Sequence, residues 1–135
     1  MKIQESLALE QTGVISIVGA GGKTSLMYAL ARELGEAGKK VLTTTTTMIF
    51  PPSGAQSEAT LVGRHAGEIL ERAGALLKTH AHLTAASQYL PADGKLKGVD
   101  PAAVETIAEA ELFDFIIVEA DGAAGRSLKA CAPHE

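Results

Sequence analysis

Apolar and polar positions alternate along the chain with two different periods, and these periods predict a layered α/β fold. Two short runs, residues 14–18 and 113–118, are almost entirely apolar, which is typical of strands buried on both faces. After the first run, apolar residues recur at helical spacing: Leu26, Met27, Leu30, Ala31 and Leu34. Strands that alternate with helices indicate a mostly parallel sheet with helices on both faces.

The next part of the chain continues this alternation less regularly. A second strand is expected from Val41 into the threonine run at residues 43–47. A weaker helical pattern over residues 69–77 is interrupted by glycines at positions 67 and 74, so we expect a broken helix there.

Two turn signals divide the later part of the chain. Residues 80–90 lead into Asp93 and Gly94, a turn dipeptide, which predicts a hairpin with residues 96–99. Asp100 and Pro101 then predict the start of another helix, as its N-cap and first helical residue.

The loop between the first strand and the first helix has the composition of a phosphate-binding loop. It has the short form G-x-x-G-K-T, because Ile17 stands where the longer consensus has its first glycine. The glycines let backbone N–H groups turn toward an anion, while Lys23 reaches terminal phosphates and Thr24 binds Mg²⁺. The predicted nucleotide contacts in this loop are Gly19, Ala20, Gly21, Gly22, Lys23, Thr24 and Ser25. A dinucleotide-binding loop is disfavoured, because its third glycine is absent.

The threonine run lies at the carboxyl end of the second predicted strand. Open α/β sheets bind ligands at this edge, so Thr45 and Thr46 are candidate contacts for the γ-phosphate, Mg²⁺ or an attacking water. Threonine also simply suits strands and loop ends, and this explanation stays open for each of the five.

Two carboxylates follow the last predicted strand at the same edge of the sheet. Glu119 and Asp121 resemble a Walker B segment, in which one carboxylate holds Mg²⁺ and a second orients the nucleophile. Arg126, in the glycine-containing loop that follows, is expected to face phosphate charge. The predicted metal contacts are therefore Thr24, Glu119 and Asp121.

The composition indicates one soluble domain over residues 1–135. The chain is 46% apolar and 21% charged, and its net charge of -4 without a basic cluster disfavours nucleic acid as a partner. Cys131 is the single cysteine, and no stretch has membrane-spanning length, so we expect no membrane association and a cytoplasmic location. His80 and His82 would share one face of a strand, where a packing role is favoured over metal binding.

The glycine loop at residues 19–26, the threonine run and residues 118–130 together resemble the YqeC family over nearly the whole chain. Members of that family are described as selenium-dependent hydroxylase accessory proteins, found with genes for selenium- and molybdenum-dependent hydroxylases. The resemblance implies a P-loop type nucleotide-binding helper in the maturation of these enzymes, with hydroxylase or cofactor-maturation proteins as partners. Because the family's chains are longer, it also implies a C-terminally truncated domain, whose exposed sheet edge favours a homo-oligomer.

Three hypotheses for function remain open from the sequence. The first is a Mg²⁺-dependent NTPase or phosphotransferase in which Lys23, Glu119 and Asp121 are catalytic, with ATP favoured because no N-K-x-D guanine motif is present. The second is a Mur-like ATP-dependent ligase, because the short loop is similar to that of Mur-type amide ligases. The third is a non-catalytic, nucleotide-gated binding module.

Overall fold

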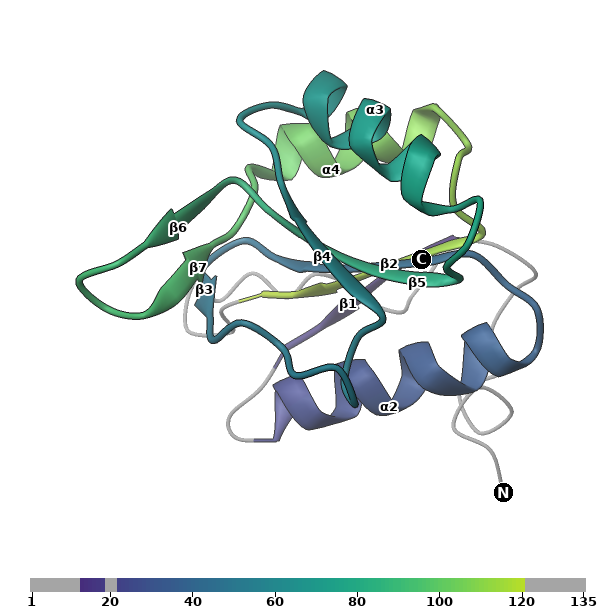
Figure 1. Ribbon diagram of the computed structural model, residues 1–135, viewed down its shortest axis with the longest axis horizontal. Helices are drawn as coiled ribbons and strands as arrows, with labels where there is room; N and C mark the ends of the chain where they lie inside the picture. Colours follow the sequence, from purple (N-terminus) through teal and green to yellow (C-terminus); the bar gives the residue numbers. More distant parts are fainter. Residues whose placement is uncertain (1–12, 19–21, 121–135) are drawn as a thin grey trace.

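The computed structural model describes residues 13–18 and 22–120 of the chain, and a five-stranded parallel sheet lies at its centre (Figure 1). The spatial order of its strands is β1 (Gly13–Ile17), β8 (Phe115–Glu119), β2 (Val41–Thr45), β5 (His82–Ala86) and β4 (Ala59–Val62). Every neighbouring pair in this sheet is parallel, so all five carboxyl ends lie at one edge. Ligands bind beyond this edge in open α/β sheets.

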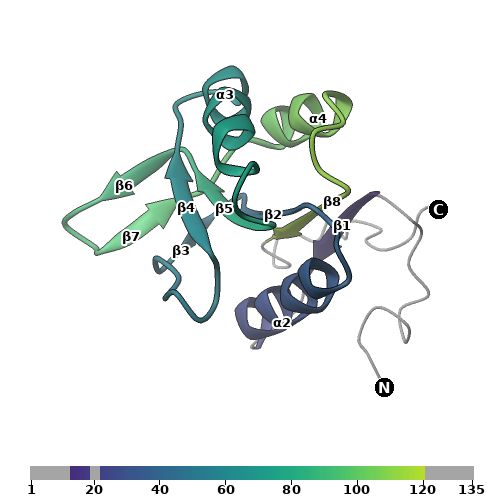
Figure 2. The ribbon, with the colours of Figure 1, turned by 45° about the vertical axis from the view of Figure 1, so that its right-hand side comes forward.

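Helices cover both faces of the sheet, as the alternation of patterns predicts. Helix α2 (Lys23–Glu36) lies on one face, and helices α3 (Ala66–Leu76) and α4 (Pro101–Glu109) lie side by side on the other (Figure 2). The predicted α/β fold with helices on both faces is therefore confirmed. Within the described ranges, every helix is too short or too polar to cross a membrane.

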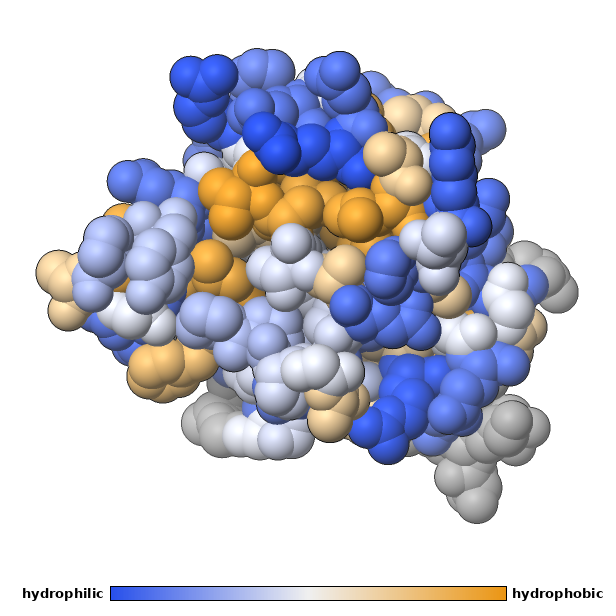
Figure 3. All heavy atoms as spheres, viewed as in Figure 1, coloured by the Kyte–Doolittle hydropathy of each residue, from blue (hydrophilic) through white to orange (hydrophobic). Residues whose placement is uncertain are grey.

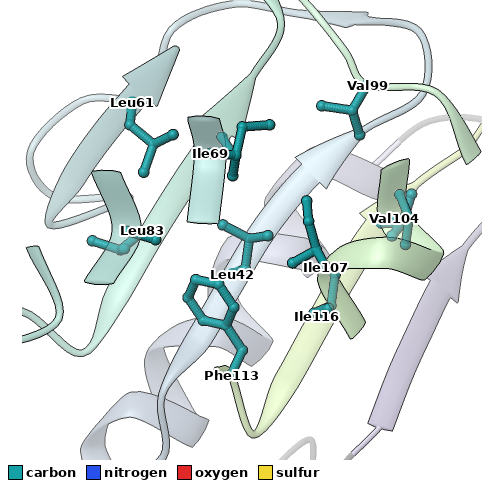
Figure 4. Packing of buried hydrophobic residues seen from close by; sticks show 12 residues of the cluster. Leu42, Leu61, Ile69, Leu83, Val99, Val104, Ile107, Phe113 and Ile116 are labelled. Atoms are coloured by element: carbon teal, nitrogen blue, oxygen red, sulfur yellow. The ribbon is translucent and has the colours of Figure 1, made fainter. Parts of the chain in front are cut away.

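Two hydrophobic cores result from the strict alternation of side chains along each buried strand. In β2, Val41 packs toward α2, whereas its neighbour Leu42 packs toward α3 and α4. Figure 4 shows Leu42 and Ile116 of the sheet facing Ile107 of α4. Burying one such side chain completely contributes about 1.5 to 3 kcal/mol to stability.

A second sheet of three short antiparallel strands projects from the main one (Figure 1). It consists of β3 (Met48–Ile49), β7 (Lys95–Lys97) and β6 (Gln88–Leu90), in this order. The β6–β7 pair is the predicted hairpin, with Gly94 at φ 63° in its turn. However, the prediction began this hairpin too early, because His82–Ala86 forms a buried parallel strand of the main sheet.

The prediction of a broken helix around residues 67 and 74 was wrong, because α3 is continuous through both glycines. Each glycine costs a helix interior about 1 kcal/mol relative to alanine. This cost is offset by burial of Ile69 and Ala73 and by the His65 side chain, which accepts a hydrogen bond from the Glu68 N–H at the start of the helix. Glycines that weaken a helix locally therefore do not break it when burial and capping stabilise the helix.

In the described residues the main sheet has β1 at one edge and β4 at the other, and β4 is a strand that the sequence pattern did not predict. Its burial alternates only partly, and Val62 is 37% exposed. Figure 3 shows apolar side chains gathered in a strip between α3 and β4, on the face of the molecule drawn there. The α3 side chains packed at the margin of the core include Leu70 and Leu76. An edge strand beside apolar side chains is a surface on which another chain can add.

Candidate functional site

The site begins at the junction between β1 and α2. Gly22 is the N-cap of α2 and has φ 73°, a left-handed conformation that favours glycine. The helix then starts at once, because the Leu26 N–H donates to the Gly22 carbonyl at 3.1 Å. The first turn of α2 contains no acidic residue of its own, and the positive end of a helix dipole favours an anion.

The first two side chains of α2 both contact the end of β8. The Thr24 hydroxyl donates to Glu119 Oε1 at 2.8 Å, and Lys23 Nζ donates to the Ala120 carbonyl oxygen at 2.9 Å. Among the described residues, Lys23 forms no ion pair with a carboxylate. The ammonium group is therefore held over the sheet edge by a neutral acceptor that an anion can replace.

The backbone of β8 joins this contact to the ends of both neighbouring strands. The Ala120 N–H donates to the Ile17 carbonyl at 3.0 Å, on the β1 side. On the β2 side, the Glu119 carbonyl accepts from the Thr45 hydroxyl at 2.9 Å and from the Thr46 N–H at 3.2 Å. Glu119 is thus held by its backbone on both sides while its carboxylate faces Thr24.

The threonine run divides into buried and accessible positions. Thr45 is fully buried, and its hydroxyl also lies 3.1 Å from that of Thr47. Thr46 is half-buried and Thr47 is exposed. Thr45 therefore holds the end of β2 against β8, and Thr46 is the predicted contact whose side chain solvent can reach.

The structure thus brings together Lys23, Thr24, Thr45, Thr46 and Glu119 from the predicted set, and Ser25 lies beside them with an exposed side chain. Gly19, Ala20, Gly21, Asp121 and Arg126 lie outside the described residues.

The model of the YqeC protein family matches residues 15–135. The chain belongs to the YqeC family. It is 38% identical over 133 residues to "Uncharacterized protein YqeC" of Escherichia coli (strain K12), covering 95% of this chain and 48% of that protein. The chain therefore spans about half the length of this curated relative, and no solved structure matches it.

In this YqeC-family chain, the α2 face of the sheet also contains a buried polar cluster that the sequence did not predict. The Thr43 hydroxyl lies 2.9 Å from His82 Nε2 and 2.7 Å from the Thr84 hydroxyl, which donates to Ser57 Oγ at 2.7 Å. Burial lowers the pKa of His82 from 6.5 to about 4, although nearby Glu58 opposes this shift. His82 is therefore neutral at pH 7 and has the packing role that the sequence favours for it.

Tyr28, one turn after Thr24, lies next to this cluster. The centroid of its ring lies 6.2 Å from the centroid of the His82 ring. Burial raises the pKa of the Tyr28 phenol to about 12, and the negative charge of Glu119 adds to the rise. The Thr84 hydroxyl opposes the rise but lies outside hydrogen-bond geometry, so the phenol has no hydrogen-bond partner in the described part of the chain. The only sequence signal for this cluster is polar residues at buried positions of predicted strands.

Proposed function

We propose that this chain is a P-loop NTPase-like domain that binds a Mg²⁺–nucleotide, with ATP favoured, at the start of α2. The observation that carries the proposal is the hydrogen bond from the Thr24 hydroxyl to the Glu119 carboxylate. A P-loop threonine and a Walker B carboxylate have this relation when they share a magnesium ion. Here they come from α2 and β8, at the carboxyl edge of a parallel sheet.

The donor set fits Mg²⁺, because a hydroxyl and a carboxylate oxygen lie within contact of each other at an accessible edge. Mg²⁺ takes oxygen ligands and keeps several waters, so few protein ligands suffice. Among the described residues, no group of three or more histidine, cysteine or acidic side chains could hold a metal. Magnesium, when bound, would neutralise charge on the phosphates.

The residues of the chain then have separate roles. Lys23 exchanges the Ala120 carbonyl for the β/γ-phosphates, Thr24 and Glu119 hold the metal, and the glycine loop supplies backbone N–H donors. Thr46 contacts the γ-phosphate or the attacking water, and Ser25 lies beside the nucleotide. From the sequence, we also propose that Asp121 orients the nucleophile and that Arg126 faces phosphate charge.

We further propose that nucleotide hydrolysis or phosphoryl transfer by this site serves the maturation of selenium- or molybdenum-dependent hydroxylases in the cytoplasm. The support for this role is membership of the YqeC family and the description of that family as accessory proteins of such hydroxylases. The proposed partners are hydroxylase or cofactor-maturation proteins, and a second copy of the chain at the β4 edge.

Calorimetric titration with ATP, GTP and CTP, each with Mg²⁺, tests the proposal. Wild-type protein is expected to bind at least one nucleotide, and Lys23→Ala is expected to lose this binding because the ammonium group is removed. Lys78→Ala is the matched control, since Lys78 is exposed and lies between α3 and the amino end of β5, whereas the site lies at the carboxyl ends of the strands. Normal nucleotide affinity in Lys23→Ala would refute the assignment.

Two further variants separate the metal from the nucleotide. Thr24→Val and Glu119→Gln are expected to retain most affinity in EDTA but to lose the gain that Mg²⁺ gives. If both variants respond to Mg²⁺ as the wild type does, the metal lies elsewhere.

A further inference from the structure

A second concave site lies at the same edge of the sheet, on the face opposite α2. It is a cavity of about 460 Å³ that we call the α3–α4 cavity, within the usual size range of small-molecule pockets. Its walls come from the residues directly after β4, β5 and β7 and from the first turns of α3 and α4. Three of its lining residues, Gly63, Ser87 and Gly98, each follow a strand directly.

The lining combines an apolar floor with a few charged and polar side chains. Ile69 and Val99 are buried and lie at the floor, and Ala103 continues it. Lys97 and Arg64 bring positive charge to the rim, and Asp100 brings negative charge. This combination is typical of sites that take a small carbon skeleton with polar substituents.

The charged groups at the rim differ in whether another group of the protein already contacts them. Arg64 Nε lies 3.5 Å from Glu68 Oε1, so part of its charge is compensated. Lys97 forms no ion pair with the described residues, and its side chain is exposed. The Asp100 carboxylate, although at the N-cap of α4, makes no side-chain capping hydrogen bond. An anionic group is therefore favoured at Lys97, and a hydroxyl or amino group at Asp100.

Two hydrogen-bonded backbone segments, residues 98–99 and 45–47, connect this cavity to the candidate nucleotide site. The Gly98 N–H donates to the Thr47 carbonyl at 2.7 Å, and the Val99 N–H donates to the Thr45 carbonyl at 2.8 Å. A Cβ atom at Gly98 would overlap the Thr45 carbonyl, so no other residue allows this approach. The threonine segment, residues 45–47, also holds Glu119 through Thr45. The cavity lining thus contacts the threonine segment that borders the candidate nucleotide site.

We propose that the α3–α4 cavity binds the second substrate of the nucleotide-dependent reaction, a small organic anion that also carries a hydroxyl or amino group. Its carboxylate or phosphate group contacts Lys97, its hydroxyl or amino group contacts Asp100, and its carbon skeleton lies over Ile69 and Val99. The role as second substrate rests on the proposed function, whereas the binding itself can be measured without nucleotide.

Chemical-shift mapping on ¹⁵N-labelled protein tests the site with three probes of this class: 3-phosphoglycerate, malate and O-phosphoserine. At concentrations up to about 10 mM, at least one probe is expected to shift the amides of Gly63, Ser87 and Gly98. Lys97→Glu is expected to weaken this binding at least about tenfold, because it reverses the charge at the anion. Lys95→Glu is the matched control, since it makes the same change on the same strand outside the cavity lining.

The outcomes distinguish this inference from the proposed function. If no probe shifts these three amides, or if Lys97→Glu binds as the wild type does, the cavity is not an anion site. Shifts confined to the amides of Lys23 and Thr24 would also overturn it, because the probes would then be binding at the phosphate loop. Cavity shifts in a protein that binds no Mg²⁺–nucleotide would support the binding site and overturn its role as a second-substrate site.

Discussion

The buried His82 gives this protein an acid sensitivity that can be worked out from the structure. The residue is only 5% exposed, and Nε2 of its ring lies 2.9 Å from the Thr43 hydroxyl. Burial penalises the charged imidazolium and lowers the pKa from 6.5 to about 4. The folded protein therefore binds a proton at His82 much more weakly than the unfolded chain does.

The sign and size of the effect follow from these two pKa values. Between pH 6.5 and about 4, the unfolded chain carries a proton at His82 that the folded chain lacks, so the free energy of unfolding falls as the pH is lowered. At pH 7 almost none of this free energy of unfolding has been lost. Linkage gives a loss of about 2 kcal/mol between pH 7 and pH 4.5 from this one residue.

Urea unfolding of wild type and His82→Gln at pH 7.0 and pH 4.5 measures the effect. Both pH values lie away from the isoelectric point of about 5.6, where association is favoured. The glutamine amide can take the place of Nε2 beside Thr43 but does not titrate. The variant is therefore expected to lose about 2 kcal/mol less stability than the wild type between the two pH values.

His80→Gln is the matched control, because His80 lies outside the buried cluster and contacts the Leu76 carbonyl at the end of α3. It is expected to show the wild-type loss. If His82→Gln and wild type lose the same stability on acidification, the reasoning is refuted, and groups other than His82 account for the acid sensitivity.

Four further substitutions test the packing and the backbone conformation. Gly98→Ala is expected to destabilise the protein by about 3 kcal/mol or more in urea unfolding, because its Cβ would overlap the Thr45 carbonyl; a change under 1 kcal/mol would contradict this close approach. Tyr28→Phe is expected to be neutral or to raise the unfolding free energy by up to about 1 kcal/mol, since it removes a buried hydroxyl that has no partner in the described residues; a large loss would reveal one. Gly74→Ala in α3 is expected to raise the thermal midpoint, with a gain of about 0.5 to 1 kcal/mol, because no described atom lies within 4 Å of the new Cβ. Gly38→Ala is its contrast and should destabilise, since Gly38 has φ 89°.

The main elements could be predicted from the sequence because burial on both faces gives a strong local pattern. The run ending at Val118 became β8, and the apolar spacing after Lys23 became α2. Where the local sequence pattern was weak, tertiary contacts determined the secondary structure and the prediction was wrong. The prediction joined β5 to a hairpin because residues 80–90 mix apolar and hydroxyl side chains and lead into the turn at Asp93 and Gly94. In the structure, His82 and Thr84 of β5 are instead hydrogen-bonded to Thr43 of the neighbouring β2.

Part of the candidate site could also be predicted, because the order of the elements fixes where their ends meet. The helix start that follows β1 and a carboxylate at the end of β8 must lie together if the two strands are parallel neighbours, and the Thr24–Glu119 hydrogen bond agrees with this expectation. Which threonine is accessible could not be predicted, because it depends on register. Pairing of Thr45 with Glu119 in adjacent strands buries one hydroxyl and leaves the next residue at the surface.

The α3–α4 cavity carried no sequence signal, because its lining comes from three separate stretches of the chain, residues 63–69, 87–88 and 97–106, and contains no motif. The structure shows the importance of Gly98 beside this cavity. Its missing side chain lets the β7–α4 connection lie against the end of β2. A ligand in the cavity would contact this connection, which is hydrogen-bonded to the threonine segment that borders the nucleotide site. Any displacement of Thr45 by one ligand would move the backbone that holds Glu119, so binding at the two sites should be coupled, and by the same factor in both directions.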